Sequence, residues 1–210
     1  GLSQSRVAIT ANFDGSELLV FGAVRRDGPP PGGPPLHVVV TVEGPSGPVT
    51  VWRKSRRMGI WINSSAVRIT QAPAFYAVAT TGPLAEIISA TEDLRHRVSI
   101  PRAIRSVGTA GTADAPDYIE ALVRLRSAAD LYQLREGSVE LAEDALLRTS
   151  VTLPANLTEG LFTVRILLLR GGTVIDSASR TIDVQKVGIE RFLFRLAREE
   201  PLAYGALALV

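Results

Sequence analysis

LPANLTEGLFTVRILLLRGGTVIDSASRTIDV, residues 153–184, carries the clearest strand signal in the chain. Residues 162–169 form an apolar run of strand length, and residues 173–184 predict the return strand. Gly171-Gly172 between them is typical of a two-residue hairpin turn, and residues 154–160 predict the turn before the hairpin. This layout is typical of the last strands of an immunoglobulin-like β-sandwich.

The first 82 residues predict a series of short strands at a spacing of about ten residues, with turn signals between them. Asp14-Gly15 is one such signal, and the Pro/Gly-rich residues 27–35 predict an exposed loop. We expect strands at residues 6–12, 17–24, 37–42, 49–53, 59–63, 66–70 and 75–80. Because about seven strands suffice for a sandwich, residues 1–82 predict an N-terminal β-sandwich.

The middle of the chain changes to a helical pattern. Pro83 and Pro116 each stand at the start of apolar residues with helical spacing, so residues 83–135 predict a helical insert or linker. Strand patterns return in residues 136–187, which predict a C-terminal β-sandwich-like region. The fold class is therefore mainly β, with immunoglobulin-like sandwich lobes and a helical insert. We expect two lobes, although one sandwich interrupted by the insert also fits the pattern.

Residues 188–210 predict a juxtamembrane helix and the start of a transmembrane anchor. Ile189, Phe192, Leu193 and Leu196 lie at i, i+3, i+4 and i+7, which predicts an amphipathic helix suited to a protein surface or a membrane interface. After Pro201 the chain carries no charge; Leu202 and Tyr204 belong to this part. A spanning helix needs about 20 apolar residues, so the alternatives are a partial membrane helix and an apolar C-terminus. We expect the former.

Composition restricts the chemistry. The 210 residues include no cysteine, only two histidines (His37 and His96) and a net charge of +2. Disulfides, thiol nucleophiles and cysteine metal sites are excluded, and two distant histidines do not favour a zinc site. Neither a phosphate-binding loop nor a Gly-x-Ser-x-Gly motif is present. We therefore expect no catalytic residue, no metal, no cofactor and no nucleic-acid partner.

Two basic segments are candidate contacts for a small anion or a partner. Arg53, Lys54, Arg56 and Arg57 form the densest run, which favours either a solvated turn or a contact with an acidic partner or lipid headgroups. The second segment begins with Arg95 and Arg97 and extends to Arg105.

Four aromatic residues accompany the basic run. Either they belong to a sandwich core, which we expect, or they form a recognition patch. They are Trp52, Trp61, Phe75 and Tyr76.

Five separated motifs carry a family resemblance. They are FDGSELLVFGAV (13–24), FYAVATTGPL (75–84), ISATEDLRHRVSIPRAIRS (88–106), LPANLTEGLFTVRI (153–166) and EEPLAYG (199–205). Together they resemble a family of alphaproteobacterial transmembrane proteins of unknown function.

The resemblance implies a signal peptide, a periplasmic domain and one C-terminal transmembrane helix, hence a single-pass inner-membrane protein with most of its chain in the periplasm. It also implies an association with genes for sulfite-exporter-like permeases. The family has no assigned activity and therefore supplies no catalytic residues.

These observations predict a non-enzymatic, membrane-anchored accessory or scaffolding domain that docks a membrane protein partner, such as a permease or exporter, and contacts the bilayer through its C-terminal helix. One alternative is a periplasmic domain that binds a small anion or another ligand. The other is a hydrolase, which requires a serine or a carboxylate beside His37 or His96.

Overall fold

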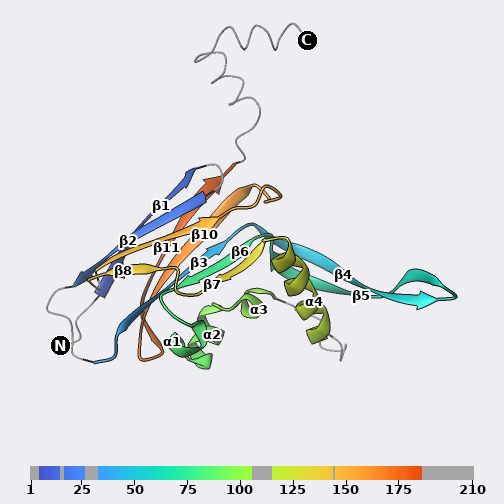
Figure 1. Cartoon of the computed structure of the whole chain (residues 1–210), viewed down its shortest axis with the longest axis horizontal. Coiled ribbons are helices and arrows are strands. Elements are labelled where there is room, and N and C mark those ends of the chain that lie inside the picture. Colours follow the sequence, from blue (N-terminus) through green and yellow to red (C-terminus); the bar gives the residue numbers. More distant parts are fainter. Residues whose placement is uncertain (1–4, 15–16, 27–32, 106–114, 144, 186–210) are drawn as a thin grey trace, which may run out of the picture.

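The computed structural model describes residues 5–14, 17–26, 33–105, 115–143 and 145–185, and this part of the chain is mainly β (Figure 1). The strands are β1 (Ser5–Asp14), β2 (Glu17–Arg26), β3 (Leu36–Glu43), β4 (Ser46–Arg57), β5 (Ile60–Pro73), β6 (Tyr76–Thr80), β7 (Tyr132–Arg135), β8 (Glu140–Ala142), β9 (Leu146–Thr152), β10 (Gly160–Arg170) and β11 (Thr173–Val184). The helices are α1 (Leu84–Ile87), α2 (Ala90–His96), α3 (Ile100–Ala103) and α4 (Ala115–Ala128).

Two sheets pack face to face and form the body of the molecule. Sheet A has the strand order β1-β2-β9-β8 and is antiparallel throughout. Sheet B has the order β11-β10-β3-β6-β7 and is antiparallel except for the parallel pair β6–β7. The hairpin predicted at Gly171-Gly172 is confirmed, because Arg170 pairs with Thr173 and both glycines have positive φ.

The central strands of sheet B, β10, β3 and β6, are buried on both faces along most of their length. On β10, Ile166 and Leu168 belong to the core shared with sheet A, whereas Leu167 and Leu169 belong to a second core beneath the helices. A strand covered on both faces is apolar at successive positions, which explains the unbroken run 166–169.

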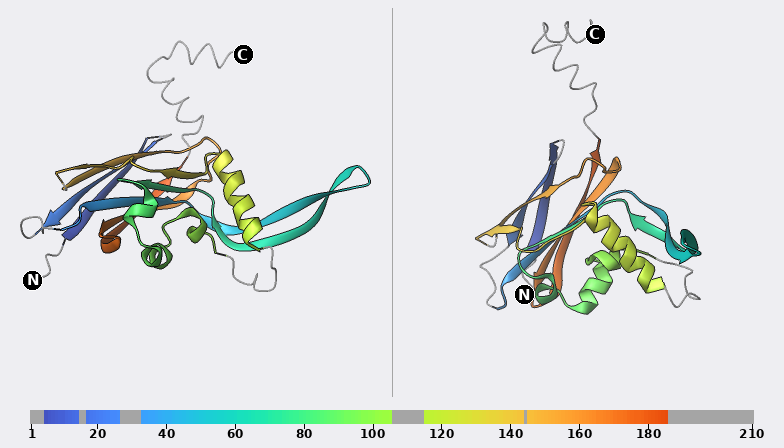
Figure 2. Two further views of the ribbon diagram at one scale, coloured as in Figure 1. Left: turned by 60° about the horizontal axis from the view of Figure 1, so that its bottom comes forward. Right: turned by 45° about the vertical axis from the view of Figure 1, so that its right-hand side comes forward.

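The four helices lie on the side of sheet B that faces away from sheet A (Figure 2). The Ser89 hydroxyl caps α2 by accepting a hydrogen bond from the Glu92 N–H at 3.3 Å. At the other end, the Asp93 carboxylate accepts hydrogen bonds from the N–H groups of Val98 and Ser99, at 3.2 and 2.7 Å. These contacts fix the turn between α2 and α3, and with it the position of Arg97.

β4 and β5 pair with each other as a separate two-stranded sheet, which we call the arm (residues 46–73). Its base packs into the core beneath the helices through Val51, Val67 and Ile69. Its distal part extends away from the body (Figures 1 and 2). Met58 and Gly59 connect the strands with φ of 51° and 83°, the positive values that a type I′ hairpin turn requires.

Several sequence-based boundaries need correction. Residues 1–82 and 136–187 do not form separate lobes, because β2 pairs with β9 and β3 pairs with β10. The strand predicted at 49–53 is part of the longer strand β4, and the two strands predicted within 59–70 are one continuous strand, β5. Strand periodicity shows where strands lie but not which strands pair.

The predicted helical insert, 83–135, does contain the four helices, but it ends in a strand. That strand, β7, pairs in parallel with β6 at the edge of sheet B. The immunoglobulin-like arrangement of the sheets stays a prediction.

Candidate functional site

The arm concentrates positive charge and contains no carboxylate of its own. Residues 46–73 contain no Asp or Glu but five cations: Arg53, Lys54, Arg56, Arg57 and Arg68. Lys54, Arg56 and Arg57 are exposed near the tip. The predicted basic run therefore lies at a strand end, and it protrudes from the body.

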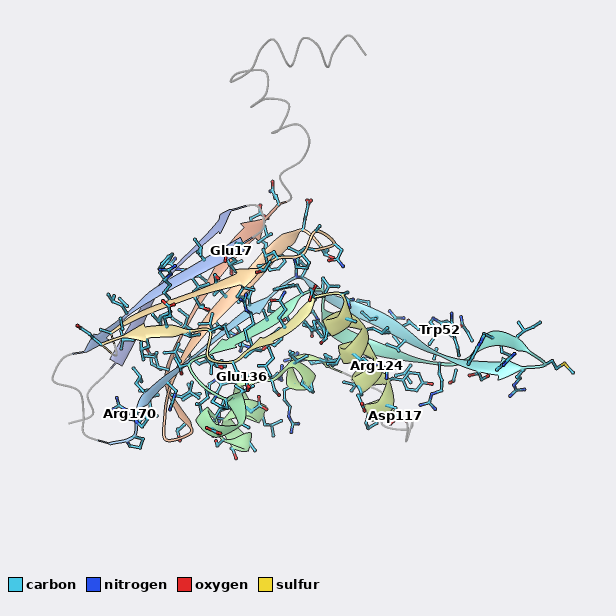
Figure 3. All side chains as sticks on the ribbon, viewed as in Figure 1. Glu17, Trp52, Asp117, Arg124, Glu136 and Arg170 are labelled. Carbon is cyan, nitrogen blue, oxygen red and sulfur yellow. The ribbon has the colours of Figure 1, made fainter. Side chains whose placement is uncertain are left out.

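Large apolar side chains share this tip. Met58 is fully exposed, and Ile60 and Trp61 are 68% and 64% exposed. Trp52, 57% exposed, lies further back on β4 (Figure 3). Exposed apolar residues that cluster within one protruding element mark an interaction site more often than scattered ones do.

Both faces of the tip have this mixed character. Arg56 is paired with Trp61 across the hairpin, and the next pair is Arg57 with Ile60. Because paired residues of antiparallel strands point to the same face and successive pairs alternate between faces, each face presents a cation beside an apolar side chain. The tip is amphipathic all round rather than on one side.

Arg53 serves a different purpose from the cations at the tip. Its guanidinium lies 3.1 Å from the Asp117 carboxylate and 4.9 Å from the centroid of the Tyr118 ring. The Tyr118 hydroxyl in turn lies 2.6 Å from the Ser65 hydroxyl. These contacts fasten the N-terminal turn of α4, where Figure 3 labels Asp117, to the arm, so Arg53 positions the arm rather than extending its cationic tip.

The expectation that the four aromatic residues form core was correct for half of them. Phe75 and Tyr76 are fully buried, and the Phe75 ring lies 6.0 Å from that of Phe162. The expectation was wrong for Trp52 and Trp61. Trp52 lies on the face of β4 opposite the buried Val51, and Trp61 lies near the tip of the arm, beyond its packed base.

A second cationic cluster lines a polar pocket of about 220 Å³ between the base of the arm and the α2–α3 segment. Its walls are Glu43, Gln71, Arg97, Ala103, Arg105 and Arg165. The structure thus brings the predicted Arg97 together with Arg105, and it adds Arg165 from β10. One signal for Arg165 was available in the sequence, since a lone cation interrupts the apolar pattern of 162–169.

Arg165 is held by several acceptors. Its guanidinium donates to the Thr41 hydroxyl at 3.1 Å and to the His96 carbonyl at 2.8 Å. The Tyr76 hydroxyl donates to the carbonyls of Arg97 and Val98, at 3.0 and 2.9 Å. Burial raises the pKa of Tyr76 to about 12, so this hydroxyl keeps its proton well above neutral pH.

Arg95 does not join the pocket. It pairs with the Glu92 carboxylate, which also lies 3.4 Å from the His96 ring and accepts the Val174 N–H at 3.2 Å. Glu92 is buried, and through Val174 it ties α2 to β11. The predicted pair Arg95 and Arg97 is therefore divided between a structural ion pair and the pocket.

Both histidines have side-chain neighbours that suit structural roles. The His37 ring lies 3.2 Å from the Thr81 hydroxyl, and His96 faces Glu92, whose oxygens already hold Arg95 and Val174. Within the described ranges, no three residues of the His, Asp and Glu types gather in a way that could hold a metal ion.

The predicted membrane-facing residues Ile189, Phe192, Leu193, Leu196, Leu202 and Tyr204 lie outside the described residues. Among the helices that the structure describes, none combines the length and the apolar character needed to cross a bilayer.

Comparison with curated proteins and with solved structures finds no match. The family resemblance that the sequence motifs carry is confirmed. A family described as "Putative transmembrane protein (Alph_Pro_TM)" matches residues 1–210, and this chain belongs to that family.

Proposed function

We propose that this protein is a non-enzymatic accessory protein of the bacterial inner membrane, with most of its chain in the periplasm. In this proposal the arm docks on the anionic surface of the bilayer beside a membrane protein partner, for which a permease or exporter is the candidate. The observation that carries the proposal is the arm, whose tip exposes apolar side chains and cations together and lacks carboxylates.

The distribution of side chains around the tip favours lipid as the occupant. A hairpin that docks on a folded protein needs one complementary face. Here the pairs Arg56–Trp61 and Arg57–Ile60 make both faces amphipathic, which suits a medium that surrounds the tip. Tryptophan favours the headgroup level of a bilayer, and Arg and Lys favour anionic headgroups.

The binding free energies expected for the tip indicate reversible docking. Each cation near an anionic leaflet contributes about 1 kcal/mol, so Lys54, Arg56 and Arg57 together contribute about 3 kcal/mol. Burying Ile60 and the Trp61 ring adds about 1.5–3 kcal/mol for each side chain. Lasting attachment takes a second signal, which in this proposal is the segment 188–210, the predicted amphipathic helix and start of an anchor.

The body that carries the arm is proposed to be of the immunoglobulin-like class.

Photo-crosslinking in native membranes tests the proposal. A photoreactive residue at Ile60 is expected to give adducts with lipid. The same residue at Leu161, 66% exposed on β10 of the body, is the control and is expected to give few.

The charge requirement is tested in the same assay. Arg56→Gln together with Arg57→Gln is expected to reduce the adducts at Ile60 about tenfold or more, since two contributions of about 1 kcal/mol are lost. Arg68→Gln, at the base of the arm, removes one charge and leaves the tip intact. Protein adducts at Ile60 without lipid adducts would assign the tip to a protein surface, and no adducts above the Leu161 level would remove the arm as a docking element.

A further inference from the structure

We infer that the polar pocket lined by Arg97, Arg105 and Arg165 binds a small oxyanion of the sulfate or phosphate type. This inference does not depend on membrane docking, because the pocket lies at the base of the arm and not at its tip.

The first argument is the charge of the walls. Three guanidinium groups and one carboxylate, that of Glu43, line a pocket of about 220 Å³, a net charge of about +2. Among the described residues, none of these three guanidinium groups forms an ion pair with a carboxylate. Like charges that share a small volume repel one another, and a bound anion removes that repulsion.

The second argument is that the Arg165 guanidinium and the backbone that carries Arg105 are positioned before any ligand arrives. Arg165 is half-buried, and its bonds to Thr41 and to the His96 carbonyl fix its guanidinium plane. Arg105 is fixed through its backbone, because its N–H and carbonyl bond to the carbonyl and N–H of Gln71, at 2.8 and 3.1 Å. A pre-positioned donor loses little freedom when a ligand binds.

The third argument concerns Arg97. It caps α2 in the left-handed conformation, with φ of 51° and ψ of 58°, a position where glycine is the usual residue because it has no Cβ. The conformation is held by the hydrogen bond from the Tyr76 hydroxyl to the Arg97 carbonyl. The side chain takes no part in that bond and lines the pocket, so a strained backbone presents a cation to the cavity.

The class of ligand follows from the donors. Guanidinium groups match the paired oxygens of sulfate, phosphate and carboxylate, and the Gln71 amide adds N–H donors. The cavity has room for more than one water molecule, each of which takes about 30 Å³ of liquid volume, and its lining is mostly polar. A small, multiply charged oxyanion fits these walls better than an apolar ligand.

Calorimetric titration of the full chain with inorganic sulfate and with inorganic phosphate, at low ionic strength, tests the inference. Arg105→Gln is expected to weaken binding about tenfold, since it removes a charge-assisted hydrogen bond. Arg97→Gly is expected to weaken binding to a similar extent without lowering the melting temperature, because glycine suits the left-handed position. Glu43→Gln is expected to strengthen binding about threefold by removing the carboxylate.

Arg102→Gln is the matched control. It removes the same charge from an exposed position on α3, outside the pocket walls, and is expected to leave the affinity nearly unchanged. Equal losses for Arg102→Gln and Arg105→Gln would overturn the site, as would the absence of heat with either anion.

Vesicles of phosphatidylglycerol distinguish a lipid headgroup from a free anion as the occupant. If the pocket takes free anions, Arg97→Gly weakens anion binding and leaves vesicle binding unchanged. Loss of both anion binding and vesicle binding in this variant would assign the pocket to headgroups and overturn the free-anion assignment. The Arg56→Gln/Arg57→Gln variant is expected to keep its affinity for sulfate, so failure of the pocket and failure of the arm proposal are separable.

Discussion

At the scale of single residues, Tyr76 joins the core beneath the helices to the polar pocket. Its side chain is fully buried in the core beneath the helices, while its hydroxyl serves the carbonyls of Arg97 and Val98 and lies 3.5 Å from the Arg165 guanidinium. Burial is the main reason that its pKa is raised to about 12, and the Glu43 carboxylate also raises it while Arg165 opposes the shift. The hydroxyl is therefore a neutral donor across the physiological range.

This shift predicts a loss of stability in alkali. The unfolded chain ionises its tyrosines near pH 10, whereas folded Tyr76 keeps its proton to about pH 12. The contribution is thus fully present below pH 10 and is lost as pH rises from 10 to 12, by about 3 kcal/mol at most. Tyr132, raised to about 12 by burial, adds a loss in the same direction. Urea unfolding at a series of pH values measures both.

Tyr76→Phe separates the two tyrosines. At neutral pH the variant is expected to be less stable by about 1–3 kcal/mol, because two carbonyls lose their donor. Its remaining alkaline loss is expected to be smaller than that of the wild type, since only Tyr132 still contributes. An alkaline loss of undiminished size in Tyr76→Phe would show that other groups cause it.

At the scale of elements, the most important feature is the corner between β3 and β4, where the arm begins. β3 ends at Glu43 and β4 begins at Ser46, and the corner between them contains Gly44. A Cβ at Gly44 would lie 3.0 Å from the Phe162 ring and 3.2 Å from the Phe75 Cβ, so the corner is packed without spare volume. The chain leaves sheet B where two aromatic side chains close the core.

Gly44→Ala is expected to destabilise the protein by about 1–3 kcal/mol through overpacking against these rings. Gly47→Ala, three residues further on, is the control, because no atom lies within 4 Å of the added Cβ. Its effect is expected to stay within about 0.5 kcal/mol. Urea denaturation followed by circular dichroism measures both variants, and equal losses would contradict the packing argument.

The elements also show how far the sequence predicts this structure. The hairpin around Gly171-Gly172, the strand β11 and the helix starts near Pro83 and Pro116 follow from local signals, and all are confirmed. The separate starts of α2 and α3 were not predicted. The arm does not follow, because alternating residues in β4 and β5 look the same whether the strand joins a sheet or leaves it. The pocket does not follow either, because it depends on contact between Arg97 and Arg165, which are 68 residues apart in the chain. Packing brings them together, and no local sequence pattern encodes that packing.

At the scale of the whole molecule, sheet B is shared by two cores. Val40 of β3 faces sheet A, while Val39 faces the helices, and the same alternation holds along β10. The N-terminal and C-terminal halves of the sequence meet in this sheet, since β3 and β10 pair along most of their length. Loss of packing on one face therefore removes support from the other.

Substitutions on opposite faces of β10 are expected to have similar effects. Leu167→Ala in the core beneath the helices and Leu168→Ala in the core shared with sheet A are each expected to cost about 2–5 kcal/mol. Both are expected to unfold in one transition. Leu161→Ala, on the exposed part of the same strand, is expected to change stability by about 0.5 kcal/mol or less. Two separate transitions in calorimetry would show that the cores unfold independently.

The arm carries the intrinsic tryptophan fluorescence of the protein. The chain has two tryptophans, Trp52 and Trp61, and both lie on the arm, outside the packed cores. Their emission reports the polarity around the arm, whereas circular dichroism reports the sheets of the body. A blue shift on addition of anionic vesicles, with an unchanged circular dichroism spectrum, would record the arm passing from water into the headgroup layer without any attached dye.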